Sequence, residues 1–314
     1  MFFRRYRGLI TALLAAALVT GLGILASHAL VDQYPQGRGG PRVITGHERT
    51  VATSRATAEI MDRLNVEVIG VPQSELEISD RFHGAANIGA SMNPDMEIIR
   101  SLQPDWVFSP RTLEGSLGPR FEAARIDVAF LNLRSIDNMY AAIAELGPLL
   151  MREVEAQALI DDYKTFKAQA QEEFVHDTSH GPPRVLILMG LPGSYMVATP
   201  NSYIGSLVAM TGAINVYEDE RAEFISINTE DMLLKQPDII LRAAHALPQD
   251  VVEMFDEEFR ENDIWRHFYA VQNGNVFDLP HYQFGMSATF EYPQALETLR
   301  QIYTLSASGG QSPY

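Results

Sequence analysis

The chain has 314 residues, of which 24 are Lys or Arg and 40 are Asp or Glu, so its formal net charge at pH 7 is −16. Apolar residues make up 46% and charged residues 20% of the chain, a globular composition that excludes a wholly disordered chain and a fibrous repeat. The excess of acidic residues argues against a surface that binds nucleic acid or anionic lipid. The absence of cysteine excludes disulfides, thiolate metal sites, Fe–S clusters, cysteine nucleophiles and lipidation on cysteine.

Residues 1–29 have the pattern of a signal or anchor segment. Arg4, Arg5 and Arg7 precede an apolar run from Gly8 to Ala26, which is close to the ~20 residues that span a bilayer. The basic residues keep the N-terminus in the cytoplasm, so the rest of the chain is exported. The segment is either an uncleaved anchor, which we favour, or a signal peptide cleaved after Ala29. Without its three arginines the exported part has 21 basic and 40 acidic residues, a net charge of −19.

The body of the chain alternates short apolar runs with amphipathic stretches, a pattern typical of an α/β protein. A Gly-, Gln- and Pro-rich stretch precedes it and a polar stretch follows it. We predict a linker at 30–41, a first α/β lobe at 42–152, an interlobe helix at 153–174, a second α/β lobe at 175–304 and a disordered tail at 305–314.

Two segments of equivalent spacing suggest that the two lobes are built alike. Glu97 is followed after six residues by Pro104-Asp105, and Glu230 is followed after six residues by Pro237-Asp238. An apolar run follows in each case, Trp106 to Phe108 or Ile239 to Leu241. Apolar runs at Pro41 to Ile44 and Pro183 to Leu188 are expected to open the two lobes.

Helix signals support this division. Asn93 is a good N-cap and Pro94 suits the first helical position, so a helix is predicted to start there. Glu153 to Phe174 contains neither Gly nor Pro and repeats its apolar residues at roughly helical spacing. Such a helix is about 33 Å long. Two lobes joined by one rigid helix would face each other across a cleft with little hinge bending.

Enzyme motifs are missing, and the candidate site residues lie instead at predicted strand–helix boundaries. The sequence has no P-loop, no Gly-x-Ser-x-Gly and no His-Glu-x-x-His. Met92 precedes the predicted helix of the first lobe, and His245 follows the predicted strand 239–241 of the second. Open α/β sheets bind ligands at such boundaries. A thioether and an imidazole converging from two lobes would provide Met/His axial ligation of haem iron.

Taken singly, each of these residues has an ordinary role in packing or hydrogen bonding. Met189, Met286 and His281 lie beside glycines or predicted strand ends and are alternative candidates for iron ligands. The loop clusters Val51 to Ser54 and Gln73-Ser74 could form turns or could donate hydrogen bonds to an anionic ligand.

Several strings, however, resemble a known family. They are VATS at 51–54, MNPD at 92–95, LNLRS at 131–135, VLILMGLPGSYMVAT at 185–199, LRAAHALP at 241–248 and FGMS at 284–287. They resemble the haem receptors of the iron-regulated surface determinant system, which belong to the helical-backbone class of ABC-importer substrate-binding proteins, alongside siderophore and cobalamin receptors. The resemblance covers about residues 41–304.

The resemblance implies an α/β fold with two Rossmann-like lobes joined by one long helix, and one haem (iron protoporphyrin IX) in the cleft. The family's axial ligands match Met92 and His245. In the wider class one surface glutamate of each lobe docks onto arginines of the permease, and Glu97 and Glu230 match these positions. Residues expected near the propionates or in the cleft are Val51, Thr53, Ser54, Ser74, Met189 and Met286.

The chain departs from the family in one respect. Gram-positive receptors of this kind are usually lipoproteins with a cysteine at the processing site, and this chain has none. The segment 8–26 would therefore attach the receptor to the outer face of the cytoplasmic membrane, or a cleaved receptor would be free. Expected partners are an ABC permease with its ATPase and an upstream surface haem-transfer protein. We expect a monomer without nucleic-acid partners and without catalytic activity.

Three other functions compete with the haem receptor. A ferric-siderophore or cobalamin receptor would need no Met/His pair. A divalent-metal receptor would need clustered His, Asp and Glu residues. An extracytoplasmic enzyme would need a catalytic constellation that the sequence does not reveal.

Overall fold

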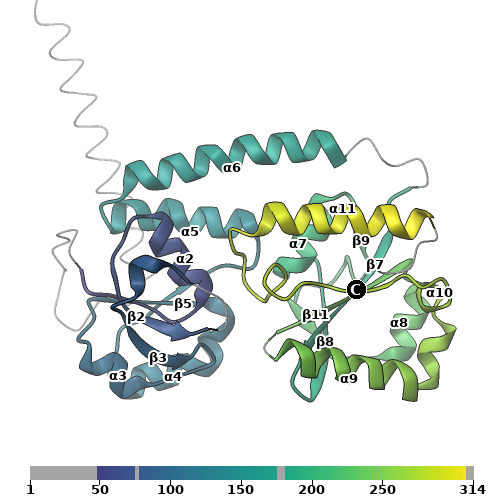
Figure 1. Ribbon diagram of the computed structural model, residues 1–314, viewed down its shortest axis with the longest axis horizontal. Coiled ribbons are helices and arrows are strands. Elements are labelled where there is room, and N and C mark those ends of the chain that lie inside the picture. Colours follow the sequence, from purple (N-terminus) through teal and green to yellow (C-terminus); the bar gives the residue numbers. More distant parts are fainter. Residues whose placement is uncertain (1–47, 75–77, 175–180, 246, 309–314) are drawn as a thin grey trace, which may run out of the picture.

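The computed structural model describes residues 48–74, 78–174, 181–245 and 247–308. Two α/β lobes lie side by side beneath one long helix, α6 (Glu153–Phe174), which spans the residues predicted for the interlobe helix (Figure 1). The predicted anchor, the predicted linker and the apolar run 41–44 lie outside the described residues. Within the described part of the chain, no helix is long and apolar enough to cross a membrane.

The first lobe is a doubly wound sheet. Its strands run in the order β4-β3-β2-β1-β5-β6, and all are parallel except β4, which pairs antiparallel with β3. The strands are β1 (Thr50–Ala52), β2 (Val68–Gln73), β3 (Ala86–Ala90), β4 (Asn93–Pro94), β5 (Trp106–Pro110) and β6 (Ala129–Leu131). The helices are α2 (Arg55–Arg63), η1 (Asp80–Phe82), α3 (Met96–Ser101), η2 (Arg111–Leu113), α4 (Glu114–Ala124) and α5 (Ile136–Leu149). Because strand order reverses between β1 and β5, these two strands mark the topological switch point, where such sheets bind ligands.

The second lobe is a mixed sheet of order β10-β8-β7-β11-β12, with β9 pairing β7. Strands β7, β11 and β12 are parallel, and β8 is antiparallel to β7. The strands are β7 (Arg184–Leu191), β8 (Ser194–Ala198), β9 (Ile214–Asn215), β10 (Phe224–Ile225), β11 (Ile239–Ala244) and β12 (Val276–Asp278). The helices are α7 (Tyr203–Met210), α8 (Thr229–Lys235), α9 (Pro248–Glu261), η3 (Asp263–His267), α10 (Tyr269–Gln272) and α11 (Tyr292–Ser308).

The two equivalent Glu/Pro-Asp segments form the same local structure. Asp105 accepts a hydrogen bond from the Arg49 amide, and Asp238 accepts one from the Arg184 amide, both at 2.8 Å. In each lobe the arginine side chain also donates to a carbonyl at the end of the preceding helix, Leu102 at 2.8 Å or Lys235 at 3.1 Å. Each acid thus joins the start of β5 or β11 to the start of the neighbouring strand, β1 or β7, and each arginine joins that strand to the end of α3 or α8. The repeat is therefore a structural element of both lobes.

Helix α3 begins two residues later than predicted. Asn93 and Pro94 form β4, and the side chain of Asp95 caps the helix by accepting hydrogen bonds from the amides of Glu97 and Ile98 at 2.9 and 3.0 Å. Proline is tolerated in β4 because that strand lies at the sheet edge. The prediction of an Asn93 cap was wrong because Asp95 is an equally good cap and the hairpin uses the preceding residues.

The predicted disordered tail is also partly wrong. Helix α11 continues to Ser308, three residues beyond the predicted start of the tail at 305. Leu305 is partly buried against the main hydrophobic core and extends the apolar face of the helix to this point. Residues 309–314 lie outside the described part of the chain.

One hydrophobic core runs through both lobes. It joins β1, β5, β6 and α5 of the first lobe to β7, β11, β12, α7 and α11 of the second. At its centre the rings of Tyr140 and Tyr163 stack with centroids 4.2 Å apart, and the Tyr140 and Tyr292 hydroxyls lie 3.1 Å apart. Because α5, α7 and α11 share this core under α6, the positions of the two sheets relative to each other are set by side-chain packing.

Helix α7 depends on a close backbone approach at Gly205. A Cβ at this position would lie 1.9 Å from the Thr199 carbonyl oxygen. We expect Gly205→Ala to lower the free energy of unfolding by about 3 kcal/mol, measured by urea denaturation. Gly118→Ala in α4 is the control, because nothing lies within 4 Å of its Cβ, and it should stabilise the protein by up to about 1 kcal/mol. Equal effects of the two substitutions would contradict the packing described for α7.

Candidate functional site

The carboxyl edges of the two sheets approach each other. Arg55, which follows β1, reaches the backbone carbonyl of Tyr282, which follows β12, at 3.5 Å. Beyond β6, the Leu133 carbonyl accepts a hydrogen bond from the Ala288 amide at 2.8 Å. Arg134 also pairs with Glu223 of the second lobe at 3.5 Å. Side chains that leave either carboxyl edge therefore face the space between the lobes.

Met92 lies at the carboxyl edge of the first lobe. It is in the two-residue turn between β3 and β4, where Ala90 pairs with Asn93, and its side chain is 51% exposed. The hairpin is tied to the sheet because the Asp95 amide donates to the Ile88 carbonyl at 2.7 Å. A large apolar side chain is thus held at the sheet edge by fixed backbone rather than buried in the core.

His245 lies at the corresponding edge of the second lobe. It directly follows β11, and its amide donates to the Gly190 carbonyl of β7 at 2.9 Å, which extends the strand pairing to this residue. Burial lowers the pKa of the His245 imidazole, so the ring is neutral at pH 7. Neutral imidazole is the form that binds metals.

Two buried hydroxyl groups mark the switch point of the first sheet. Thr53 and Ser109 directly extend the paired residues Ala52 and Phe108 of β1 and β5. Both side chains are fully buried, and neither hydroxyl has a hydrogen-bond partner among the described residues. They lie beside the start of α2, whose first amides have no acceptors within the helix. Unpartnered donors at a helix N-terminus suit a carboxylate.

The other residues predicted for the cleft have different surroundings. Ser54 caps α2 by accepting a hydrogen bond from the Thr57 amide at 3.1 Å. Ser74 follows β2 at the carboxyl edge and is exposed. Met286 is half-buried against the main core, in the segment that joins β12 to α11.

Val51 and Met189 are core residues, contrary to prediction. Both side chains are fully buried, Val51 in β1 and Met189 in the middle of β7. The string 51–54 was interpreted as a loop, but its first two residues complete a strand. Because parallel strands are covered on both faces, their central residues face helices rather than a ligand.

A cavity of about 640 Å³ lies at the carboxyl ends of β11 and β12. Its walls include Ala244, the first turns of α9 with Pro248 and Val251, and the segment with His281 and Tyr282. Tyr282 is 43% exposed, and Leu247, which precedes α9, is 48% exposed. Neither residue was predicted for the site, although Leu247 is an apolar residue close to the candidate ligand His245 and Tyr282 lies near a strand end.

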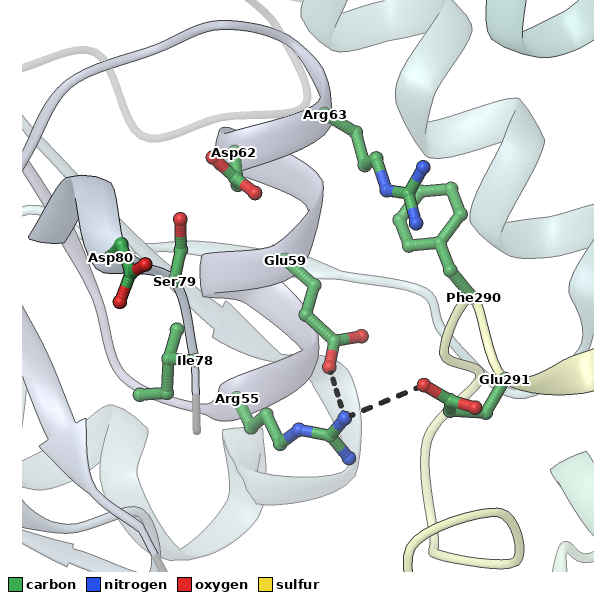
Figure 2. A pocket seen from close by; sticks show the side chains of 9 residues that line it. All are labelled: Arg55, Glu59, Asp62, Arg63, Ile78, Ser79, Asp80, Phe290 and Glu291. Carbon is green, nitrogen blue, oxygen red and sulfur yellow. Dashed lines mark ion pairs between the residues drawn. The ribbon is translucent and has the colours of Figure 1, made fainter. Parts of the chain in front are cut away.

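A second cavity, of about 370 Å³, lies on the outer face of α2 (Figure 2). It is lined by Arg55, Glu59, Asp62, Arg63, Ile78, Ser79, Asp80, Phe290 and Glu291. Arg55 Nη2 contacts Glu59 at 2.7 Å and Glu291 at 3.9 Å (Figure 2). The contact with Glu291 joins α2 of the first lobe to the segment that leads into α11.

Glu97 and Glu230 occupy equivalent positions in the two lobes. Each is the second residue of its helix, α3 or α8, and each is exposed. Within the described residues, no three His, Asp or Glu side chains are grouped so that they could hold a metal ion.

Comparisons with known proteins agree with this architecture. The family model described as "Periplasmic binding protein" matches residues 50–282. The chain is 36% identical to the high-affinity heme uptake system protein IsdE of Staphylococcus aureus (strain Newman), over 82% of this chain and 88% of that protein. The crystal structure of S. aureus IsdE complexed with heme has a TM-score of 0.78 and covers 82% of this chain and 98% of its own. An ABC transporter substrate-binding protein from Listeria monocytogenes EGD-e is 43% identical, with a TM-score of 0.76 and the same two coverages.

The Arg55 cluster predicts a pH dependence of stability. Burial, assisted by neighbouring Glu291, raises the pKa of Glu59 despite the opposing charge of Arg55. The native state therefore binds more protons than the unfolded state, and this contribution to stability is lost as the pH rises through the native pKa. We expect Glu59→Gln to gain stability relative to the unchanged protein between about pH 4.5 and 7, measured by urea denaturation at each pH.

Glu297→Gln provides a control of opposite sign. A hydrogen bond from Arg300 lowers the pKa of Glu297, so its contribution to stability is lost as the pH falls. This variant should lose stability relative to the unchanged protein as the pH rises from about 3 to about 5, and the difference should then stay level up to pH 7. The raised pKa of Glu59 would be contradicted if the stability of Glu59→Gln relative to the unchanged protein did not depend on pH. It would also be contradicted if that relative stability fell with rising pH, as expected for Glu297→Gln.

Proposed function

The chain belongs to the periplasmic binding protein family, and on that premise we propose that it is a haem receptor of an ABC importer. Receptors of this family bind a substrate outside the cytoplasm for a permease and its ATPase, and they are not enzymes. The relative IsdE, a heme uptake protein that is 36% identical over most of both chains, supports haem as the substrate.

The observation that carries the proposal is a thioether and an imidazole, one at each carboxyl edge, whose chemistry suits the binding of haem iron. Met92 offers an exposed thioether from the first lobe, and His245 offers a neutral imidazole from the second. Neither ligand adds charge to a complex that already carries two propionates. We propose that one haem lies between the lobes with these two residues as axial ligands.

The surroundings of the pair suit the rest of the haem molecule. The exposed apolar side chains of Met92, Leu247 and Tyr282 all lie at the carboxyl edges, where they would cover the porphyrin faces and gain free energy from the hydrophobic effect. The Thr53 and Ser109 hydroxyls and the start of α2 would donate hydrogen bonds to a propionate. An acidic exterior would not attract an anionic ligand, so affinity would come from these contacts and from iron ligation.

We also propose that Glu97 and Glu230 dock the receptor onto basic residues of the permease. Their equivalent exposed positions would place one carboxylate at each lobe, and the −19 charge of the exported chain is complementary to a basic partner. The N-terminal segment would hold the receptor at the outer face of the cytoplasmic membrane. An upstream surface protein would supply the haem.

Haem titration followed by absorbance spectroscopy tests the ligand pair. We expect the unchanged chain to form a saturable one-to-one complex with a low-spin spectrum in at least one oxidation state of the iron. Met92→Ala and His245→Ala should each weaken binding and change the spectrum. His245→Ala should have the larger effect because imidazole is the stronger iron ligand.

Met189→Ala is a control for these substitutions, because it also removes a thioether but from the core. It should lower stability and leave the spectrum of the folded protein unchanged. If Met92→Ala and His245→Ala both kept the original spectrum and affinity, the ligand assignment would be wrong. If the unchanged protein bound a ferric siderophore or cobalamin and no haem, the proposed substrate would be wrong.

Reversal of the docking charges tests the permease contact. The double variant Glu97→Lys, Glu230→Lys should bind haem with unchanged affinity and should support much slower haem uptake in cells that express the importer. The control is Glu114→Lys with Glu261→Lys, which reverses two other exposed acids on α4 and α9. Slower uptake by the control as well, or loss of haem binding by the docking variant, would contradict the assignment.

A further inference from the structure

A second imidazole leaves the same sheet edge as His245. Strands β11 and β12 are parallel neighbours, and their last paired residues are Arg242 and Asp278. The Leu279 amide donates to the Arg242 carbonyl at 2.8 Å, so the pairing continues past the end of β12. His245 and His281 each lie three residues beyond this last pair. Because adjacent strands are about 4.8 Å apart, the two segments that carry these histidines leave the sheet side by side, and His281 but not His245 lines the cavity at this edge.

His281 is directed to the cavity at this edge. It is half-buried, and it lines the 640 Å³ cavity together with Tyr282 and Ala244. Its ring packs edge-on against the Tyr282 ring, with centroids 6.0 Å apart and an interplanar angle of 89°. Tyr282 is in turn held by the contact of its carbonyl with Arg55 of the first lobe. The imidazole is therefore placed by packing from both lobes.

Two of the charged side chains that line this cavity, Arg242 and Asp278, are paired with each other, and Glu253 also lines it. Arg242 donates to Asp278 at 2.7 Å and contacts Asp256 at 2.9 Å. The walls beside them, Pro248 and Val251 among them, are apolar. A guanidinium shared by two carboxylates is a poor site for an anionic group. The cavity instead suits a flat apolar ligand with a metal centre that an imidazole can bind.

We propose that His281 is a second haem-iron ligand of the C-terminal lobe, which holds the iron when His245 does not. The exchange breaks the Fe–N bond to one imidazole and forms an Fe–N bond to the other, with no electron transferred. This inference rests on the proposed function. It gives the receptor a route by which haem can move within the cleft without losing all protein ligands.

Variants of the full-length chain in non-ionic detergent test the proposal, with protein-free detergent as the blank. The set is His245→Ala, His281→Phe, the double variant and His267→Phe. Phenylalanine at 281 keeps a ring against Tyr282 but cannot bind iron. His267→Phe is the control because His267 is exposed at the end of η3 and does not line the cavity. Ferric haem is titrated into each, and affinity, absorbance and electron paramagnetic resonance spectra are recorded.

We expect His245→Ala to keep a one-to-one complex with a nitrogen-ligated spectrum, and the double variant to lose that signature with at least about a tenfold further loss of affinity. Added imidazole should restore the signature to the double variant. His267→Phe combined with His245→Ala should match His245→Ala alone. Circular dichroism and urea unfolding verify that each variant is folded.

Two results would overturn the proposal: a double variant that matches His245→Ala in affinity and spectrum, or a folded His245→Ala that has no nitrogen ligand at the iron. Failure of the proposed function is distinguishable from both, since in that case the unchanged chain itself would take up no haem.

Discussion

The continuous hydrophobic core beneath α6 is the constraint on which the rest of the structure depends. Helices α5, α7 and α11 are buried in it together, and the tyrosines at 140, 163 and 292 pack against one another at its centre. Two separate cores would allow the lobes to rotate freely, whereas a shared core resists any motion that exposes apolar surface. The carboxyl edges are consequently held near each other, and contacts such as Arg55 with Tyr282 can form between them.

Because the shared core fixes the two sheets relative to each other, each lobe contributes to the proposed site the side chains at its own carboxyl edge. In both lobes the same Asp and Arg interaction joins the start of a central strand, β1 or β7, to the start of its neighbour, β5 or β11. The two halves therefore hold equivalent positions although their sheets differ in strand order. The first lobe supplies a thioether on a tight hairpin and, at its switch point, two hydroxyls that have no hydrogen-bond partner among the described residues. The second supplies two imidazoles at neighbouring strand ends. The proposed haem site combines contributions that neither lobe has alone.

Much of this architecture was predictable because it depends on local patterns. The absence of Gly and Pro between 153 and 174 identified α6, and the paired Glu/Pro-Asp segments revealed two similar lobes. Predictions failed where two local sequence signals were equally good and contacts between distant parts of the chain selected one of them. Asn93 and Asp95 are both good caps, and strand pairing at β4 selected Asp95. Val51 and Met189 could not be distinguished from edge residues, because their burial comes from helices distant in sequence. Leu247, Tyr282 and the neighbouring placement of His281 likewise depend on strand register.

X-ray absorption spectroscopy at the iron edge of the haem-loaded receptor tests the central claim most directly, because it identifies the atoms bound to iron. The account predicts a sulfur scatterer together with porphyrin and imidazole nitrogens in at least one oxidation state, since one lobe contributes a thioether and the other an imidazole. A first shell without sulfur in both the ferric and the ferrous complex would contradict it.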